Sequence, residues 1–188
     1  MGLTSFSLPR MAGSSRGASD KTIRIWDKDT GRCLQALKGH RDGIKQLLLT
    51  PDGRLISGAG SILKSSDSTI RVWDIDTGQC LHVFEGHRDG ITQLLLTPDG
   101  RLISGASDKT IRVWNIDTGE CIHVLKGHGD GIDQLLLTPD GRLISGASDK
   151  TIRVWDIDTG ECIHVLEGHR DGITQLLLTP DGRLISGG

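Results

Sequence analysis

The sequence predicts an all-β protein made of repeated four-stranded antiparallel sheets. Three observations lead to this expectation. The chain repeats itself with a period of 41 residues, and each repeat holds four short apolar segments bounded by turn residues. No long segment places its apolar residues about 3.6 positions apart, as an amphipathic helix does. The pattern therefore favours one small sheet per repeat over a helical solenoid.

The repeat is defined by tryptophan and by a Gly-His pair, which recur at the same three intervals of 47, 41 and 41 residues. The tryptophans are Trp26, Trp73, Trp114 and Trp155. The first interval is longer because one repeat contains six extra residues, which we place at 60–65. Residues 106–146 and 147–187 differ at only four positions, which indicates recent duplication or deliberate construction.

Within one repeat, the first expected strand is residues 91–97, an almost continuous apolar run typical of a strand buried on both faces. It ends at a Pro-Asp-Gly turn, where proline presets one backbone angle and glycine accepts a positive φ. Three further strands follow, separated by polar turns. They are expected at residues 101–105, 110–114 and 121–125.

These residues resemble the repeat unit of the WD-repeat β-propeller family. The string GH…TPDGRLISGASDKTIRVWD carries the resemblance, which covers residues 18–188. It implies a β-propeller of four-stranded antiparallel blades, with four blade equivalents in this chain. Asn115 stands where the other repeats have aspartate after tryptophan, a replacement that the family often shows.

The resemblance also implies one structural hydrogen-bond network per blade. It joins the histidine of the Gly-His pair, a second-strand serine, a turn aspartate and the third-strand tryptophan. Buried indole, hydroxyl and imidazole groups all require partners, and a carboxylate can fix the histidine tautomer. Three sets are complete within single blades: His40, Ser57, Asp67 and Trp73; His87, Ser104, Asp108 and Trp114; and His128, Ser145, Asp149 and Trp155.

The fourth set is divided between the two ends of the repeat region. Asp20 and Trp26 belong to third and fourth strands only, whereas His169 and Ser186 belong to first and second strands only. Joining tail to head would complete one blade and cover two exposed strand edges. Since rings in this family usually have seven or eight blades, we expect two chains to close into an eight-bladed homodimer. Closure of one chain into four blades is the alternative.

The leader, residues 1–17, breaks the repeat and is rich in serine and glycine, so we expect it to be disordered. A second interpretation aligns residues 3–10 with a degenerate first strand, which would complete the N-terminal blade and block pairing there. The insertion at 60–65 is expected to lengthen the loop between second and third strands without disturbing the sheet.

Composition argues against several classes of partner. With 24 acidic and 22 basic side chains, the net charge of −2 is too balanced for a general nucleic-acid binder. Aromatic residues make up only 3% of the chain, and no apolar run is long enough to span a bilayer. We therefore expect a cytoplasmic protein with neither a nucleic-acid nor a membrane partner.

Histidine and cysteine do not indicate a metal or catalytic site. Three histidines outside the Gly-His pairs recur one blade apart, so they cannot converge on one ion. The Ser–His–Asp sets lie beside tryptophan in every blade, which favours structure over catalysis. The isolated cysteines are interpreted as packing thiols. We expect no catalytic residue, no metal and no cofactor. The residues concerned are His82, His123, His164, Cys33, Cys80, Cys121 and Cys162.

The surface offers one candidate face for a protein or peptide partner. The arginines that directly follow the Gly-His pairs form the first set: Arg41, Arg88 and Arg170. The second set is one position that differs between repeats and that the resemblance places near the central opening of the ring: Lys45, Thr92, Asp133 and Thr174. A solvated loop balanced by neighbouring aspartates is the alternative interpretation of the arginines. We expect a non-enzymatic, self-assembling scaffold; the alternative is an engineered or recently amplified assembly module without a selected ligand.

Overall fold

The structure is a computed structural model that describes residues 20–60 and 67–188. The expected leader at 1–17 and residues 61–65 of the insertion lie outside the described residues. The described residues form β-strands joined by turns, as follows: β1 Ile23–Trp26, β2 Cys33–Leu37, β3 Ile44–Leu49, β4 Arg54–Ala59, β5 Ile70–Asp74, β6 Cys80–Phe84, β7 Ile91–Leu96, β8 Arg101–Ala106, β9 Ile111–Asn115, β10 Cys121–Leu125, β11 Ile132–Leu137, β12 Arg142–Ala147, β13 Ile152–Asp156, β14 Cys162–Leu166, β15 Gln175–Leu178 and β16 Leu184–Gly187.

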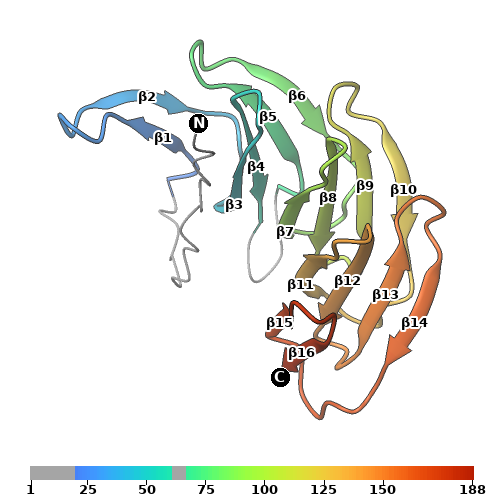
Figure 1. Cartoon of the computed structure of the whole chain (residues 1–188). Coiled ribbons are helices and arrows are strands. Elements are labelled where there is room, and N and C mark those ends of the chain that lie inside the picture. Colours follow the sequence, from blue (N-terminus) through green and yellow to red (C-terminus); the bar gives the residue numbers. More distant parts are fainter. Residues whose placement is uncertain (1–19, 61–66) are drawn as a thin grey trace, which may run out of the picture.

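The strands form three four-stranded and two two-stranded antiparallel sheets in the described part of the chain. We call β3–β6 the first blade, β7–β10 the second blade and β11–β14 the third blade. Strands β1–β2 form the N-terminal half-blade, and β15–β16 form the C-terminal half-blade. Figure 1 shows the sheets side by side in an arc, with β3, β7 and β11 on its inner side. The all-β fold of four-stranded blades is thus confirmed.

Turn chemistry explains why each repeat folds back on itself. Between β7 and β8, the amide of Gly100 donates to the carbonyl of Thr97 at 3.0 Å, and Gly100 has a φ of 86°. The Thr97 hydroxyl also accepts the amide of Arg101 at 2.8 Å. A residue with a side chain would be strained at this φ, so glycine fixes the reversal of the chain.

The second strand of each blade, rather than the first, is buried on both faces. Leu102, Ile103 and Ser104 in β8 are completely inaccessible. In β7 only Ile91 and Leu94 are buried, and the residues between and after them are partly open. The expectation of a first strand buried on both faces is therefore wrong. The first strand borders the inner side of the arc, whereas the second is enclosed by its own sheet and by the adjacent blades.

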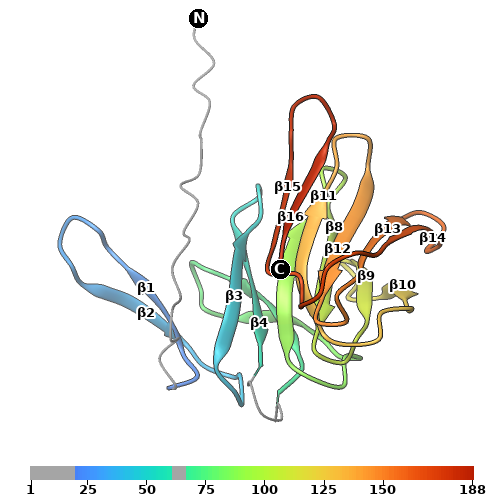
Figure 2. The same ribbon diagram turned by 90° about the horizontal axis from the view of Figure 1, so that it is seen from below.

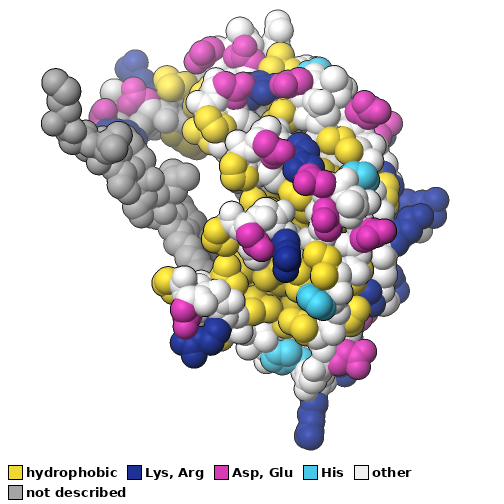
Figure 3. Space-filling view, turned by 45° about the vertical axis from the view of Figure 1, so that its right-hand side comes forward, with side chains coloured by type: hydrophobic (Ala, Val, Ile, Leu, Met, Phe, Trp, Pro, Cys, Tyr) yellow, Lys and Arg dark blue, Asp and Glu magenta, His cyan; other side chains and the backbone are white. Residues whose placement is uncertain are grey.

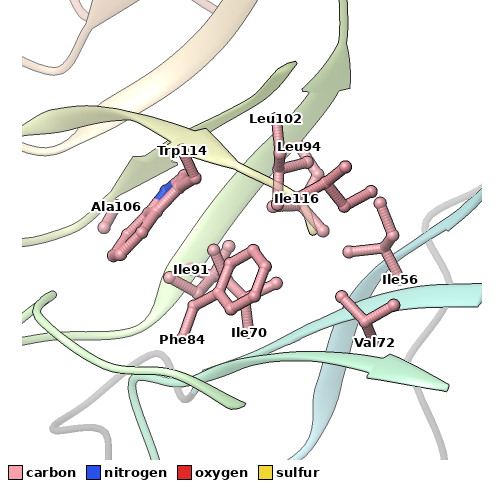
Figure 4. Packing of buried hydrophobic residues seen from close by; sticks show 10 residues of the cluster. All are labelled: Ile56, Ile70, Val72, Phe84, Ile91, Leu94, Leu102, Ala106, Trp114 and Ile116. Carbon is pink, nitrogen blue, oxygen red and sulfur yellow. The ribbon is translucent and has the colours of Figure 1, made fainter. Parts of the chain in front are cut away.

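Adjacent blades are held together by apolar side chains. In Figure 4, Phe84 and Ile70 of the first blade face Ile91 and Trp114 of the second. The Phe84 and Trp114 rings are stacked with centroids 5.5 Å apart. Burying a large apolar side chain contributes about 1.5–3 kcal/mol, so this contact is a main stabiliser of the blade order.

The six extra residues leave the sheet of the first blade unchanged. Ser57 pairs with Arg71 in the same register that joins Ser104 to Arg112 in the second blade. The amide of Ala59 donates to Thr69 at 3.3 Å, as the corresponding amide does in the other two blades. The additional length is therefore contained in the connection between β4 and β5.

The two half-blades are not paired with each other in the structure. In Figure 1 they lie at opposite ends of the arc, and Figure 2 shows the same separation from below. Among the described strands, β1 pairs only with β2, and β16 only with β15. The four-bladed closure of a single chain, considered above as an alternative, is not the arrangement found.

Candidate functional site

Each full blade contains a buried chain of hydrogen bonds. In the second blade, His87 Nδ1 lies 3.0 Å from Asp108 Oδ2, and His87 Nε2 lies 2.7 Å from Ser104 Oγ. The indole of Trp114 donates to the same serine oxygen at 2.8 Å. Because a carboxylate can only accept, the ring donates from Nδ1 and accepts the serine proton at Nε2. The indole nitrogen, the serine hydroxyl and both ring nitrogens of the histidine therefore each have a hydrogen-bond partner.

The first and third blades repeat this geometry. Their histidine–aspartate distances are both 2.9 Å, their histidine–serine distances 2.7 Å and their tryptophan–serine distances 2.8 Å. The residues involved are His40, Ser57, Asp67 and Trp73 in the first blade, and His128, Ser145, Asp149 and Trp155 in the third. The serines are completely inaccessible, so these sets connect strands and present no nucleophile to a substrate.

The networks hold their aspartates in the ionised form. Burial alone would raise the pKa of Asp67 and of Asp108, but the hydrogen bonds from histidine, threonine and backbone amides outweigh it. Both pKa values are therefore well below their usual range, and that of Asp149 falls to about 2 for the same reasons. Burial lowers the pKa of His128, against the opposing effect of Asp149. In the third blade, this direction favours a neutral His128 beside the Asp149 carboxylate.

The fourth network is present as two separate halves. His169 Nε2 lies 2.8 Å from Ser186 Oγ in the C-terminal half-blade. In the N-terminal half-blade, Asp20 Oδ1 accepts the amide of Thr22 at 3.1 Å, just as Asp108 Oδ1 accepts that of Thr110. The structure does not bring His169 and Ser186 to Asp20 and Trp26. Each half nevertheless has the local geometry found in a complete blade.

Large apolar side chains are exposed next to both half-blades. Leu166 of the third blade is 41% exposed, although Leu125, at the same position in the second blade, is buried. Leu47 of the first blade is 50% exposed, although the corresponding Leu94 is buried. Each exposed leucine lies where the adjacent sheet has only two strands among the described residues. The exposed apolar surface therefore lies beside the two half-blades.

A groove of about 710 Å³ lies between the third blade and the C-terminal half-blade. Its apolar lining includes Ile144, Val154 and Leu166 on one side and Leu178 and Leu184 on the other. In Figure 3, hydrophobic side chains gather in the lower part of the molecule, at the height of these elements in Figure 1. The groove is thus an apolar hollow that the described residues offer to a partner.

The candidate partner face lies on the loops that lead into the first strands. Arg41, Arg88 and Arg170 are exposed, and the backbone amides of the first two donate to the network aspartates at 2.6 and 2.8 Å. Gly129, at the corresponding position, donates in the same way to Asp149 at 2.6 Å. In the three full blades, the networks therefore fix the backbone of these loops, and the side chains of Arg41 and Arg88 remain exposed.

The variable position close to these loops has different surroundings in each blade. Lys45 and Thr174 are exposed, whereas Thr92 and Asp133 are half-buried. Asp133 Oδ2 accepts a hydrogen bond from Ser148 Oγ at 2.6 Å, and burial raises the pKa of its carboxyl group. The four positions belong to separate blades, so they form a series along the arc and not one cluster.

The interpretation of the cysteines as packing thiols is wrong for three of the four. Cys33, Cys80 and Cys162 are exposed, and Cys121 is half-buried. The first residue of each fourth strand lies at the outer edge of its sheet, where no further strand covers it. Among the described residues, no group of His, Cys, Asp or Glu side chains is arranged to hold a metal, and no helix is long and apolar enough to cross a membrane.

Sequence reasoning missed the ion pairs between blades. Arg54 of the first blade contacts Asp117 of the second at 2.9 Å, and Arg101 of the second contacts Asp158 of the third at 2.8 Å. Each arginine follows the Pro-Asp-Gly turn, and each aspartate lies in the next repeat. Apart from the six extra residues in the first blade, the arginine and the aspartate of each pair are equally far apart in the sequence. This regular spacing was the available signal, but it does not show which repeats face each other.

The sheet architecture and the recurring His–Ser–Asp–Trp arrangement define a repeat protein of the β-propeller class. The family model described as "WD domain, G-beta repeat" matches residues 31–74, 78–115, 119–156 and 160–188. The chain belongs to this family. Its members typically bind other proteins and generally act as scaffolds without enzymatic activity.

The similar proteins include one solved structure and several curated sequences. The crystal structure of the computationally designed Ika8 protein superposes with a TM-score of 0.78 and 37% identity, covering 91% of this chain and 51% of that one. Nuclear distribution protein PAC1 of Coccidioides posadasii (strain C735) is 44% identical over 50 residues, which are 27% of this chain and 10% of that protein.

A Lissencephaly-1 homolog of Schistosoma mansoni is 45% identical over 53 residues, covering 26% of this chain and 13% of that protein. Each of these two matches therefore covers only about a tenth of the curated relative's length. They show which repeat this chain resembles.

Proposed function

We propose that the chain is a non-enzymatic interaction scaffold that assembles by half-blade complementation. In this proposal, the N-terminal half-blade of one copy pairs with the C-terminal half-blade of another. Two copies then share two blades and form an eight-bladed ring with two-fold symmetry. The observation that carries the proposal is the complementary exposure of Trp26 and Leu166, which are 55% and 41% exposed.

Contacts within the chain support a pairing of these two residues. A buried apolar side chain at the end of each fourth strand belongs to the same cluster as the tryptophan of the following blade. The three pairs are Leu37 and Trp73, Phe84 and Trp114, and Leu125 and Trp155. Leu166 is the next residue in the first series, and Trp26 is the tryptophan of the half-blade that would follow it. Docking of a second copy would complete the same contact.

The inner strands provide a second match. A Cβ atom added to Gly105 would lie 2.7 Å from Ile132 Cγ2 in the following blade, and the same close approach joins Gly146 to Ile173. Only glycine leaves room for the isoleucine. Gly187 occupies this position in the C-terminal half-blade, where a Cβ atom would meet only Gln175 Cβ at 3.8 Å. Ile44 of a second copy would fill the open space.

The number of blades supports an assembly of two copies. The described residues of one chain form three full blades and two halves, which makes four blade equivalents. Rings of the WD-repeat family usually have seven or eight blades, so two copies are the smallest closed assembly that fits. The match to half of the designed Ika8 chain is consistent with a ring twice as large as one copy of this chain.

The solution mass, measured by native mass spectrometry over a dilution series, tests the assembly. We expect a species of twice the 20.3 kDa chain mass that dissociates on dilution. Gly187→Val should abolish it, because the new side chain fills the space for the incoming isoleucine. Gly129→Val is the matched control, since other repeats carry arginine at that position. A monomer at every concentration, or a dimer unaffected by Gly187→Val, would contradict the proposal.

The scaffold would present its loop face to a protein or peptide with acidic groups. Arg88 and Arg170 support this part of the proposal, because both side chains are exposed and the network aspartate Asp108 fixes the backbone at Arg88. A defined protein partner should bind with micromolar or tighter affinity and lose binding when both arginines are changed to glutamate. The double variant should keep its dimeric mass, which serves as the control. The proposed location is the cytoplasm.

The second candidate function is an assembly module without a selected ligand. The near-identity of residues 106–146 and 147–187, together with the similarity to a computationally designed protein, favours it. In this case the dimer forms normally, and the charge reversal at the two arginines changes no binding. The two candidates therefore share the assembly and differ only in the loop face.

A further inference from the structure

We propose that Lys28 makes the junction between two copies weaker and more salt-sensitive than the junctions within one chain. The inference rests on the proposed self-assembly and identifies the residue that sets its strength. Lys28 occupies a position where other repeats place an isoleucine against the preceding blade. The junction between two copies therefore has lysine where the junctions inside the chain have isoleucine.

The blades within the chain define what this position does. The third strand of each full blade ends with Trp and one acidic or amide residue, and isoleucine follows directly after it. Ile116 in the second blade and Ile157 in the third are buried. Ile157 lines a groove together with Asp99 and Arg101 of the preceding blade. The isoleucine therefore seals a junction between consecutive blades.

The N-terminal half-blade has lysine at the corresponding position. Lys28 is exposed, and its ammonium group lies 2.6 Å from Asp29 Oδ1. On docking, the residue would occupy the place of Ile157 at the junction with the third blade of the second copy. Asp140 of the third blade is the equivalent of Asp99 in the second. It lines the groove between the third blade and the C-terminal half-blade, and its side chain is largely exposed. The lysine would lie beside this carboxylate.

The charges of the docking elements are complementary. Residues 20–38 of the N-terminal half-blade carry five basic and three acidic side chains, for a net charge of +2. The corresponding residues 149–167 of the third blade carry two basic and five acidic side chains, for a net charge of −3. Opposite charges attract the two copies but are screened by salt, whereas a buried isoleucine is not. The lysine thus exchanges apolar contact for salt-dependent attraction.

Dimer dissociation constants of the full chain provide the test, measured at about 0.05 M and about 0.5 M NaCl. Lys28→Ile should lower the constant at least about tenfold, the effect of burying one large apolar side chain, and should flatten its salt dependence. Lys28→Gln removes the charge without adding apolar surface, so it should raise the constant at low salt. Circular dichroism checks that both variants keep the β-sheet content of the parent chain.

The outcomes separate this inference from the proposed assembly. If the parent chain is monomeric at all concentrations, the assembly itself fails, and the role of Lys28 fails with it. If the parent chain forms the dimer but Lys28→Ile leaves the dissociation constant unchanged or raises it, only the inference is overturned. A dimer with no salt dependence would overturn it as well.

Discussion

Trp26 and Trp73 occupy the same position in consecutive repeats, yet 55% of Trp26 is exposed and only 2% of Trp73. Trp73 donates its indole hydrogen to Ser57 and lies in a cluster with Leu37 of the preceding half-blade. The sheet that carries Trp26 has no first and second strands among the described residues. Trp26 is therefore exposed because its sheet lacks, among the described residues, the two strands that cover Trp73 in the first blade.

Fluorescence quenching should detect the burial of Trp26 on assembly. In dilute protein, acrylamide should quench this tryptophan strongly, because the other three are almost inaccessible. As the concentration rises into the range of the dimer, the quenchable fraction should fall. Subtracting the signal of the Trp26→Phe variant isolates the contribution of Trp26. Quenching that stays constant while the mass doubles would place Trp26 outside the interface.

Removal of a network serine should destabilise a full blade far more than a half-blade. Ser104→Ala leaves the Trp114 indole and the His87 imidazole without their shared partner inside the core. We expect a loss of about 2–4 kcal/mol in the free energy of unfolding. Ser186→Ala, the matched control in the C-terminal half-blade, should cost less than about 1 kcal/mol in the monomer, because its surroundings are partly open.

Urea denaturation of dilute protein measures both variants under conditions where the monomer dominates. Equal losses from the two substitutions would show that the serine hydrogen bonds contribute no more in a complete network than in half of one.

Stability should fall steadily as the solution becomes acidic. Burial lowers the pKa of His128, so the unfolded chain binds a proton on this histidine more readily than the folded chain does. This contribution is present above the ordinary histidine pKa of 6.5 and is lost as the pH falls through the folded value.

The network aspartates act in the same direction at lower pH. The pKa of Asp149 is lowered from 3.8 to about 2, so its stabilising contribution is complete above about pH 4 and disappears below about pH 2. Urea midpoints measured from neutral to acidic pH should fall in two steps, one from His128 and one, at lower pH, from the network aspartates. Asp149→Asn should make the step at lower pH smaller. A midpoint that rises on acidification would contradict this assignment.

A new ion pair between copies should join Arg142 to Asp29. Within the chain, Arg54 and Arg101 reach an aspartate of the following blade, and their side chains are 24% and 22% exposed. The Arg142 side chain, at the next equivalent position, is 52% exposed and contacts only Asp140 among the described acidic residues, at 3.4 Å. Asp29 would supply the carboxylate from the second copy.

A double-mutant cycle on the dimer dissociation constant measures this pair. Arg142→Ala and Asp29→Ala should each weaken the dimer, and together they should weaken it less than the sum of the single effects. A coupling of about 0.5–1 kcal/mol is expected for a partly exposed pair. Arg54→Ala, at an intramolecular pair, is the control and should leave dimerisation unchanged. Strictly additive effects would exclude the Arg142–Asp29 contact.

The sequence alone determined the features that repeat along the chain. The period of Trp and Gly-His predicted the all-β class and the four-stranded sheets, and the alternation of apolar runs with Pro-Asp-Gly turns placed the strands within one or two residues. The resemblance to the WD-repeat family implied the residues of each network, such as His87 with Ser104. The repeat pattern assigned third and fourth strands to one end and first and second strands to the other. These features depend on local turn chemistry and on regular spacing, both of which are written in the residues themselves.

The tertiary structure decided everything that depends on which sheet lies beside a residue. Leu125 and Leu166 have nearly the same sequence surroundings, but only the first is covered by a following full blade. The pairing of Arg54 with Asp117 likewise depends on the order and spacing of the blades. Burial and ion pairing arise between elements distant in the sequence. Because the repeats are nearly identical in sequence, the sequence does not show which repeat is covered by an adjacent blade.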